Sequence, residues 1–227
     1  MMFEIIQKLI KDDFDKFKVA LTHSSYINEN SSKEYLESNE RLEYLGDSVI
    51  SYVVSEYLYQ NYPGLPEGDL SKIRSEIVNQ KSLSNYSKKL QLGNQLILGK
   101  GEEMSNGRNK VSTLCNLFES VVGYLSINLG LEQTSIYLID LFKNQIDEIY
   151  SNKSYFDSKS LLQEKLQEIG EELPVYKPEI LKDGSFLIKL FIMNKLVSKG
   201  HGRKKIDAEK IAAKDALKKY NNFKKND

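Results

Sequence analysis

Three carboxylates lie at helical spacing in the segment 39–48, which reads NERLEYLGDS. Glu40, Glu43 and Asp47 stand at positions i, i+3 and i+7, so an α-helix would carry them on one face. Like charges at this spacing each destabilise a helix by a few tenths of a kcal/mol unless a cation neutralises them. The face is therefore either a cation site or a solvated acidic surface whose Glu40 favours the helix N-terminus.

A second polar pair, Asn116 and Glu119, lies at i and i+3 within the apolar helical segment 114–122. A glutamate among apolar residues is unusual unless it is paired or binds a metal. Oxygen ligands without His or Cys select hard ions such as Mg²⁺ or Mn²⁺. Clustered carboxylates that hold such ions suit phosphodiester hydrolysis, in which the metal activates water and neutralises developing charge. A two-histidine mechanism is disfavoured, because His23 and His201 are the only candidates.

The elements that must position these residues are helices. Apolar residues recur at helical spacing from Phe3 to about Tyr150, which predicts an all-α domain over residues 1–150. The Gly-, Pro- and Asn-containing stretches 63–69 and 99–109 are predicted to be loops. The polar segment 151–157 lacks helical periodicity and is predicted to be a linker.

The pattern changes in residues 158–222, where a small α+β domain is expected. A short helix over 161–169 precedes extended segments at 175–180, 186–193 and 196–199, and a helix follows over 207–220. The order α-β-β-β-α predicts one small sheet backed by two helices, with residues 223–227 as a tail. His201, between Gly200 and Gly202, is predicted to lie in a turn.

Charge divides between the two predicted domains. Residues 1–150 hold 15 Lys and Arg and 21 Asp and Glu, a net charge of −6. Residues 151–227 hold 17 Lys and Arg and 11 Asp and Glu, a net charge of +6, so the formal net charge of the whole chain is zero. In the last helix Lys210, Lys214 and Lys218 follow the basic run Arg203-Lys204-Lys205. This asymmetry favours a polyanion partner for the second domain, and a solvated charged face is the alternative.

Cysteine content and hydropathy limit the remaining classes. Cys115 is the only cysteine, which excludes an intramolecular disulfide and a structural zinc site and favours a reducing cytoplasm. The first residues, MMFEIIQKLIKDD, are typical of an amphipathic helix, and no stretch resembles a membrane span. We therefore expect neither an export signal nor a membrane partner.

The segment 39–48 closely resembles the signature of bacterial ribonuclease III. The resemblance extends over nearly the whole chain: LTHSSY at 21–26, PEGDLSKIRSEIV at 66–78, LGKGEE at 98–103, LFESVVGYL at 117–125 and KSLLQEKLQ at 159–167. It implies a homodimeric endoribonuclease that cuts double-stranded RNA, processes ribosomal and other structured RNA precursors, and leaves 5′-phosphate and 3′-hydroxyl ends. It also implies a C-terminal double-stranded-RNA-binding domain, Mg²⁺ as the cofactor with Mn²⁺ as a substitute, and no small-molecule cofactor.

The resemblance assigns roles residue by residue. The metal ligands would be Glu43, Asp47, Asn116 and Glu119, with Glu40 and Glu67 supporting catalysis and Tyr44 packing across the dimer axis. Residues that would contact RNA are Gln163 and Glu164 in the minor groove, Lys204 and Lys205 on phosphates, and the neighbouring cations Arg203 and Lys210.

Three positions depart from the family pattern. Asn116 stands where the family carries an aspartate, so its side chain offers an oxygen but no charge. The loop 182–185 is short and lacks the usual histidine, and Ile206 replaces a cation of the phosphate cluster. Two other functions remain open: a double-stranded-RNA-binding protein whose nuclease site is impaired at Asn116, and a helical interaction protein unrelated to RNA.

Overall fold

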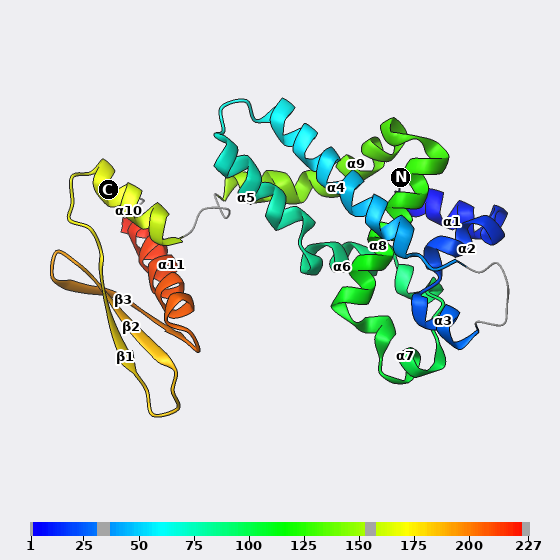
Figure 1. Ribbon diagram of the computed structural model, residues 1–227. Coiled ribbons are helices and arrows are strands. Elements are labelled where there is room, and N and C mark those ends of the chain that lie inside the picture. Colours follow the sequence, from blue (N-terminus) through cyan, green and yellow to red (C-terminus); the bar gives the residue numbers. More distant parts are fainter. Residues whose placement is uncertain (1, 31–36, 153–157, 224–227) are drawn as a thin grey trace. The chain divides into compact units, whose positions relative to one another are not determined.

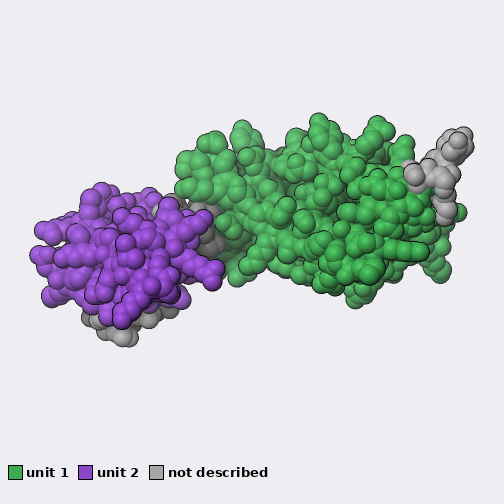
Figure 2. Space-filling view, turned by 60° about the horizontal axis from the view of Figure 1, so that its bottom comes forward, with its two compact units in different colours: residues 1–155 green, residues 156–227 purple. Residues whose placement is uncertain are grey.

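The computed structural model describes residues 2–30, 37–152 and 158–223, with side chains described as far as residue 219. Contacts divide the chain into two compact units, residues 1–155 and 156–227, which Figure 2 colours separately. Within the described ranges, no helix is both long enough and apolar enough to cross a membrane.

The first unit is helical, which confirms the predicted all-α domain (Figure 1). Its α-helices and 3₁₀ turns are α1 (Met2–Asp12), α2 (Phe14–Leu21), α3 (Ser24–Glu29), α4 (Glu40–Asn61), α5 (Glu67–Val78), α6 (Gln80–Lys89), η1 (Leu92–Gln95), α7 (Lys100–Met104), η2 (Gly107–Asn109), α8 (Val111–Leu129) and α9 (Leu131–Ser151).

Helix α8 lies at the centre of this unit. It is buried around most of its circumference, and it packs against α2, α4, α6 and α9. Phe118 on α8 is fully buried near Phe142 of α9, with ring centroids 6.1 Å apart. A helix surrounded by apolar neighbours can carry polar side chains only where they are paired or functional, so Asn116 and Glu119 stand out in it.

Two predicted loops contain helix. The stretch 63–69 ends in the first turn of α5, which begins at Glu67 directly after Pro66. The stretch 99–109 holds α7 and η2. Helix α7 is capped from a distance, because the Glu29 carboxylate accepts hydrogen bonds from the backbone N–H groups of Lys100 and Gly101 at 2.7 and 3.0 Å. A cap supplied about seventy residues away leaves no local sequence signal.

The second unit has the predicted α-β-β-β-α order. It consists of α10 (Ser158–Glu168), β1 (Val175–Ile180), β2 (Phe186–Ile192), β3 (Lys195–Gly202) and α11 (Lys205–Phe223). The strands form an antiparallel sheet in the order β1-β2-β3. Leu162 and Leu166 of α10, Ile188 and Leu190 of β2 and the alanines of α11 make its core.

The third strand is longer than predicted. Met193 and Asn194 adopt positive φ angles of 48° and 60°, so β2 and β3 are joined by a tight hairpin and β3 starts at Lys195. Pairing then continues to Gly202. The prediction that His201 lies in a turn is wrong: it is paired with Leu187 in the sheet, because the glycines on either side do not interrupt the strand.

Candidate metal centre and nucleic-acid interface

Two glycines allow α4 and α8 to approach closely. A Cβ atom added at Gly46 would lie 1.8 Å from the Glu119 carbonyl oxygen, and one added at Gly123 would lie 2.1 Å from the Leu42 carbonyl oxygen. Side chains larger than hydrogen are therefore excluded from both positions. The crossing brings Glu43 and Asp47 on α4 near Glu119 on α8.

The start of α4 is fixed by a buried hydrogen-bond network. Asn39, which is 2% exposed, precedes the helix, and its Nδ2 lies 3.5 Å from the Ser120 hydroxyl on α8. The Ser120 hydroxyl donates to the Ala20 carbonyl at 2.7 Å, and the Asn39 backbone N–H donates to the Thr22 carbonyl at 2.8 Å. These bonds hold the carboxylate face of α4 in register with α8.

The carboxylates of the two helices influence one another electrostatically. Burial, and then the charges of Asp47 and Glu43, raise the pKa of Glu119 to about 7, with a Cys115 hydrogen bond acting in the opposite direction. Burial followed by the Glu40 and Asp47 charges also raises the pKa of Glu43. A cluster of this kind is destabilised by its own charge, and a divalent cation would relieve the repulsion.

Asn116 joins this cluster through Glu43. A hydrogen bond from the Asn116 side chain lowers the pKa of Glu43 and so opposes the larger effect of burial. An ionised carboxylate only accepts hydrogen bonds, so the amide nitrogen of Asn116 must face Glu43. An amide oxygen is a neutral ligand of hard cations.

Cys115 contacts the same cluster. Its Sγ lies 3.5 Å from Glu119 Oε1. Burial and the charge of Glu119 raise the pKa of the Cys115 thiol, so the thiol stays protonated and donates to the carboxylate.

The donor set fits a hard divalent cation. Glu43, Asp47 and Glu119 supply anionic oxygens and Asn116 a neutral one, which is the ligand chemistry of Mg²⁺ and Mn²⁺. Among the described residues, no three His, Cys, Asp or Glu side chains form a group placed to hold a metal ion by themselves. The ligand set therefore includes the amide of Asn116, whose hydrogen bond with Glu43 brings it to the carboxylates.

Glu40 and Glu67, which the resemblance assigns to catalysis, have different surroundings. Glu40 is exposed at the start of α4, accepts a hydrogen bond from the Ser38 hydroxyl at 3.1 Å and acts on Glu43 through its charge. Glu67 is exposed at the start of α5, accepts from the Ser71 hydroxyl at 2.8 Å and lines a groove with Tyr59 and Arg74. No contact joins Glu67 to the carboxylate cluster within the described side chains.

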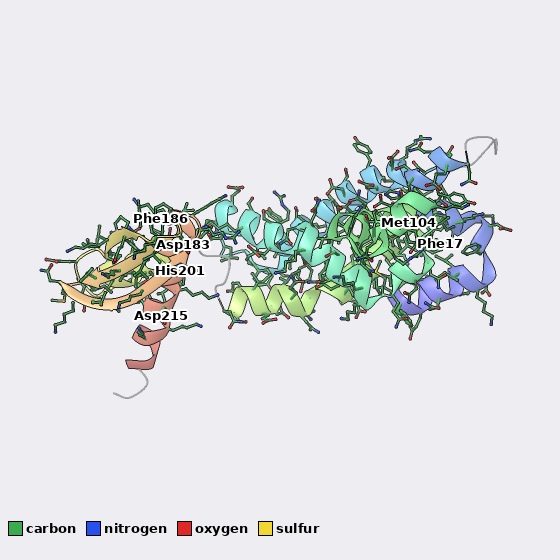
Figure 3. The ribbon with its side chains drawn as sticks, turned by 90° about the horizontal axis from the view of Figure 1, so that it is seen from below. Phe17, Met104, Asp183, Phe186, His201 and Asp215 are labelled. Atoms are coloured by element: carbon green, nitrogen blue, oxygen red, sulfur yellow. The ribbon has the colours of Figure 1, made fainter. Side chains whose placement is uncertain are left out.

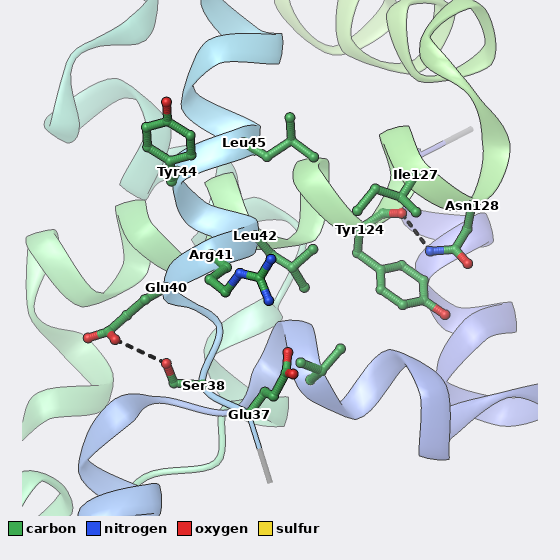
Figure 4. Close-up of a pocket in the computed structure, with 11 residues that line it drawn as sticks. Glu37, Ser38, Glu40, Arg41, Leu42, Tyr44, Leu45, Tyr124, Ile127 and Asn128 are labelled. Carbon is green, nitrogen blue, oxygen red and sulfur yellow. Dashed lines mark hydrogen bonds between the residues drawn. The ribbon is translucent and has the colours of Figure 1, made fainter. Parts of the chain in front are cut away.

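Tyr44 projects from α4 beside an apolar hollow. Its side chain is 78% exposed, and the neighbouring cavity of about 720 Å³ is shown in Figure 4. Leu42, Leu45, Tyr124 and Ile127 contribute the apolar lining. An exposed aromatic next to an apolar cavity on the same surface is a feature of self-complementary interfaces.

In the second unit the predicted RNA-contacting residues lie on α10, on α11 and in the connection that precedes α11. Gln163 and Glu164 are exposed on α10, and Arg203, Lys204, Lys205 and Lys210 are exposed before or within α11. Lys205 lies 3.9 Å from Glu209, an ion pair one turn along the helix. Lys204 and Lys205 thus lie at the N-terminus of α11, where backbone N–H groups also attract anions.

Three side chains joined by hydrogen bonds hold the short loop 182–185. Ser185 Oγ donates to Asp183 Oδ1 at 2.6 Å and lies 2.8 Å from His201 Nε2. The serine's one proton is directed at the carboxylate, so His201 Nε2 must be the donor in the second bond. Asp183 and His201 are both labelled in Figure 3, and a cleft of about 450 Å³ lies between this loop and Arg203.

Sequence reasoning missed several residues that matter here. Gly46 and Gly123 are helical glycines, and glycine inside a helix signals close packing when nothing else explains it. Ser120 and Cys115 carried no signal, because a buried hydroxyl or thiol becomes informative only once its partners are known.

Comparison with protein families matches both units. The model of a family described as Ribonuclease-III-like matches residues 15–146, and that of the double-stranded RNA binding motif matches residues 158–220.

Relatives and solved structures point the same way. The chain is 40% identical over 215 residues to the Ribonuclease 3 of Borreliella burgdorferi, covering 93% of this chain and 87% of the relative. It is 42% identical over 204 residues to the Ribonuclease 3 of Caldanaerobacter subterraneus, covering 88% and 89%. The ribonuclease III nuclease domain of Campylobacter jejuni, described as flexible in a region involved in dimer formation, superposes with a TM-score of 0.54. It is 34% identical, and the match covers 61% of this chain and 96% of that one.

Proposed function

The chain belongs to the ribonuclease III family, and from this we propose how its residues cut RNA. It is an endoribonuclease with a double-stranded-RNA-binding domain. We assign the helical nuclease domain to residues 1–150, the RNA-binding domain to residues 158–222, and the linker between them to residues 151–157. The division into two compact units and the two matched segments support this assignment.

The nuclease site that we propose is the carboxylate cluster between α4 and α8. Ribonucleases of this family need a divalent metal, and we propose that Glu43, Asp47 and Glu119, together with the Asn116 amide oxygen, hold Mg²⁺ or Mn²⁺. Such an ion supplies Lewis-acid stabilisation of phosphate charge and lowers the pKa of water. The observation that carries the proposal is the glycine-mediated crossing, which gathers carboxylates from two distant segments at one place.

The chain's own residues supply position and charge. Burial and the close helices fix Glu43 and Glu119, so their oxygens do not need to be ordered when the substrate binds. Glu40 lies at the exposed edge of the cluster, where it can orient the nucleophile or the RNA backbone. Glu67 serves RNA positioning from the neighbouring groove.

The duplex would be held by the second domain. Gln163 and Glu164 on α10 suit the shallow minor groove, where 2′-hydroxyls are read. Lys204 and Lys205, with Arg203 and Lys210, suit the phosphates, in keeping with the net charge of +6 over residues 151–227. The substrates that we propose are structured precursors, including those of ribosomal RNA.

We also propose that the enzyme is a homodimer of the cytoplasm. Tyr44 and the adjacent cavity would meet the same surface of a second copy, with each tyrosine entering the partner's cavity. The dimer would present two metal centres, one for each strand of the duplex. The single buried cysteine fits a reducing compartment.

A double-stranded-RNA-binding protein with an impaired nuclease site is not favoured, because the relatives that match nearly the whole chain are named Ribonuclease 3. Incubating the protein with a long RNA duplex and Mg²⁺, and in parallel with EDTA, tests the choice. An enzyme gives metal-dependent fragments with 5′-phosphate ends. Intact duplex that remains bound to the protein in the presence of Mg²⁺ would establish the alternative.

A further inference from the structure

The sheet of the second unit has an outer face, directed away from α10 and α11. The inward positions of β3 are fixed by contacts with α11: the Ser198 hydroxyl donates to the Ala212 carbonyl at 2.7 Å, and a Cβ at Gly200 would lie 2.0 Å from the Ala208 carbonyl oxygen. Side chains alternate along a strand, so Lys199 projects from the outer face.

Three lysines form a row across this outer face. Lys177 on β1 is directly opposite Lys189 on β2, and Lys189 is directly opposite Lys199 on β3. Like charges directly opposite one another destabilise a sheet. Glu179 compensates part of this charge, since its Oε2 lies 2.7 Å from Lys189 Nζ. The outer-face positions of the three strands thus carry one carboxylate and three lysines. The stability of the sheet does not explain this excess of positive charge.

An apolar row lies beside the lysine row. Val175, Phe191 and Leu196 are paired across the same strands, and Val175 and Leu196 are 53% and 48% exposed. Lys177 Nζ lies 4.8 Å from the centre of the Phe191 ring, so the two rows touch. The outer face therefore offers cations and an aromatic ring side by side.

We propose that the outer face binds an unpaired segment of the RNA, with phosphates on the lysine row and bases on the apolar row. Single-stranded RNA is bound by positive charge together with aromatic side chains on which bases stack. A duplex would use the lysines but hides its bases, so it leaves the apolar row without a role. The residues proposed for the duplex include Gln163 and Glu164 of α10 and Lys205 of α11, which lie in the helical layer instead.

The inference rests on the proposed function, because the unpaired segment belongs to the same substrate. A structured precursor carries unpaired strands next to its duplex. A second site on the RNA-binding domain would then favour duplexes flanked by single strands over blunt ones.

The test measures fluorescence anisotropy of the full chain in EDTA with two probes. One is a single-stranded RNA of about 12 nucleotides, and the other is a blunt duplex of about 20 base pairs, long enough for one RNA-binding module. The outer-face double variant carries Lys177→Glu and Lys199→Glu. The control double variant carries Lys81→Glu and Lys143→Glu, which replace exposed lysines of the first unit and change the net charge by the same amount. Because the new glutamates flank Lys189, the two like-charge pairs of the wild type become opposite-charge pairs, so the sheet is not destabilised.

We expect the outer-face double variant to bind the single strand at least tenfold more weakly than the control. The slope of log affinity against log salt concentration should be shallower by about 1.4, because two phosphate contacts are lost. Blunt-duplex binding in EDTA, and duplex cleavage measured separately with Mg²⁺, should match those of the control. Phe191→Leu should weaken single-strand binding by about tenfold but leave binding of inorganic polyphosphate, which has no bases, unchanged.

Each other outcome overturns the inference. Single-strand affinity equal in the two double variants would show that the outer face does not bind RNA. Equal loss of duplex binding would make the face part of the duplex site. Binding of poly-glutamate, lost in the outer-face variant while single-strand binding persists, would identify an acidic protein as the occupant. A wild-type protein that neither binds nor cuts duplex would instead contradict the proposed function.

Discussion

Replacing Gly46 with alanine tests whether the close crossing of α4 and α8 builds the metal centre. The added Cβ would lie 1.8 Å from the Glu119 carbonyl oxygen, whereas real Cβ atoms essentially never approach within 3.0 Å. The contact atom is backbone, so it cannot be relieved by a side-chain rotation. The two helices must therefore separate by about 1.2 Å, and Glu43 and Asp47 move away from Glu119 by a similar distance.

The magnitude of the effect follows from this displacement. Overpacking of a core typically costs about 1 to 3 kcal/mol, which leaves a domain of ordinary stability folded. A displacement of about 1 Å in a catalytic group can lower a rate by about a hundredfold. We expect Gly46→Ala to remain folded, to melt at a lower temperature and to cut duplex RNA about a hundredfold more slowly under single-turnover conditions, with duplex binding unchanged.

Gly64→Ala is the matched control. Gly64 lies in an exposed loop with nothing within 4 Å of its added Cβ, so this variant should melt and cut like the wild type. Thermal denaturation by circular dichroism and single-turnover cleavage measure the two effects. If Gly46→Ala kept the wild-type melting temperature and cut within threefold of the wild-type rate, the crossing would not be what positions the carboxylates.

Three further predictions concern charge. Asn116→Asp should lower the Mg²⁺ concentration for half-maximal cleavage by about tenfold, equivalent to roughly 1.4 kcal/mol, because it adds an anionic ligand. Asn116→Ala should raise that concentration. Identical Mg²⁺ titrations for wild type and both variants would exclude Asn116 as a ligand. The pKa of Glu119 is raised above its unfolded value to about 7, so folding favours the protonated carboxyl. The metal-free protein should therefore become less stable as pH rises from about 5 to about 8. After allowance for partial exposure, the loss in the free energy of unfolding should be about 1 to 2 kcal/mol. Glu119→Gln should remove this loss in melting experiments with EDTA, and an unchanged pH dependence would contradict the repulsion. Deleting residues 151–227 should leave a dimer, by light scattering, that cuts better at low salt than at physiological salt; a monomer would contradict the interface at Tyr44.

The sequence predicted what depends on local spacing. The carboxylates of α4 share a face because their intervals match the helical repeat, and the second domain was recognisable from its change of periodicity. The sequence also predicted Asn116 and Glu119 as unusual polar residues in an apolar helix, where the structure places them beside Glu43 and Asp47.

What depends on distant contacts was not predictable from one sequence. Helix α7 is capped by Glu29 from α3, and this stabilises a helix in a stretch whose glycines and asparagines predict a loop. The position of His201 depends on how far β3 extends, which the hairpin at Met193 and Asn194 determines. The cross-strand lysine row likewise appears only once the pairing of all three strands is known.

We propose that the carboxylates of α4 and α8 hold the metal with which this chain cuts RNA. The most direct measurement is cleavage and binding of one labelled duplex by wild type and by Glu119→Gln, with Mg²⁺ for cleavage and with EDTA for binding. We expect Glu119→Gln to lose cleavage while its affinity for the duplex stays within a few-fold of wild type, since binding belongs largely to the second domain. Cleavage by Glu119→Gln within a few-fold of the wild-type rate would show that Glu119 does not hold the catalytic metal.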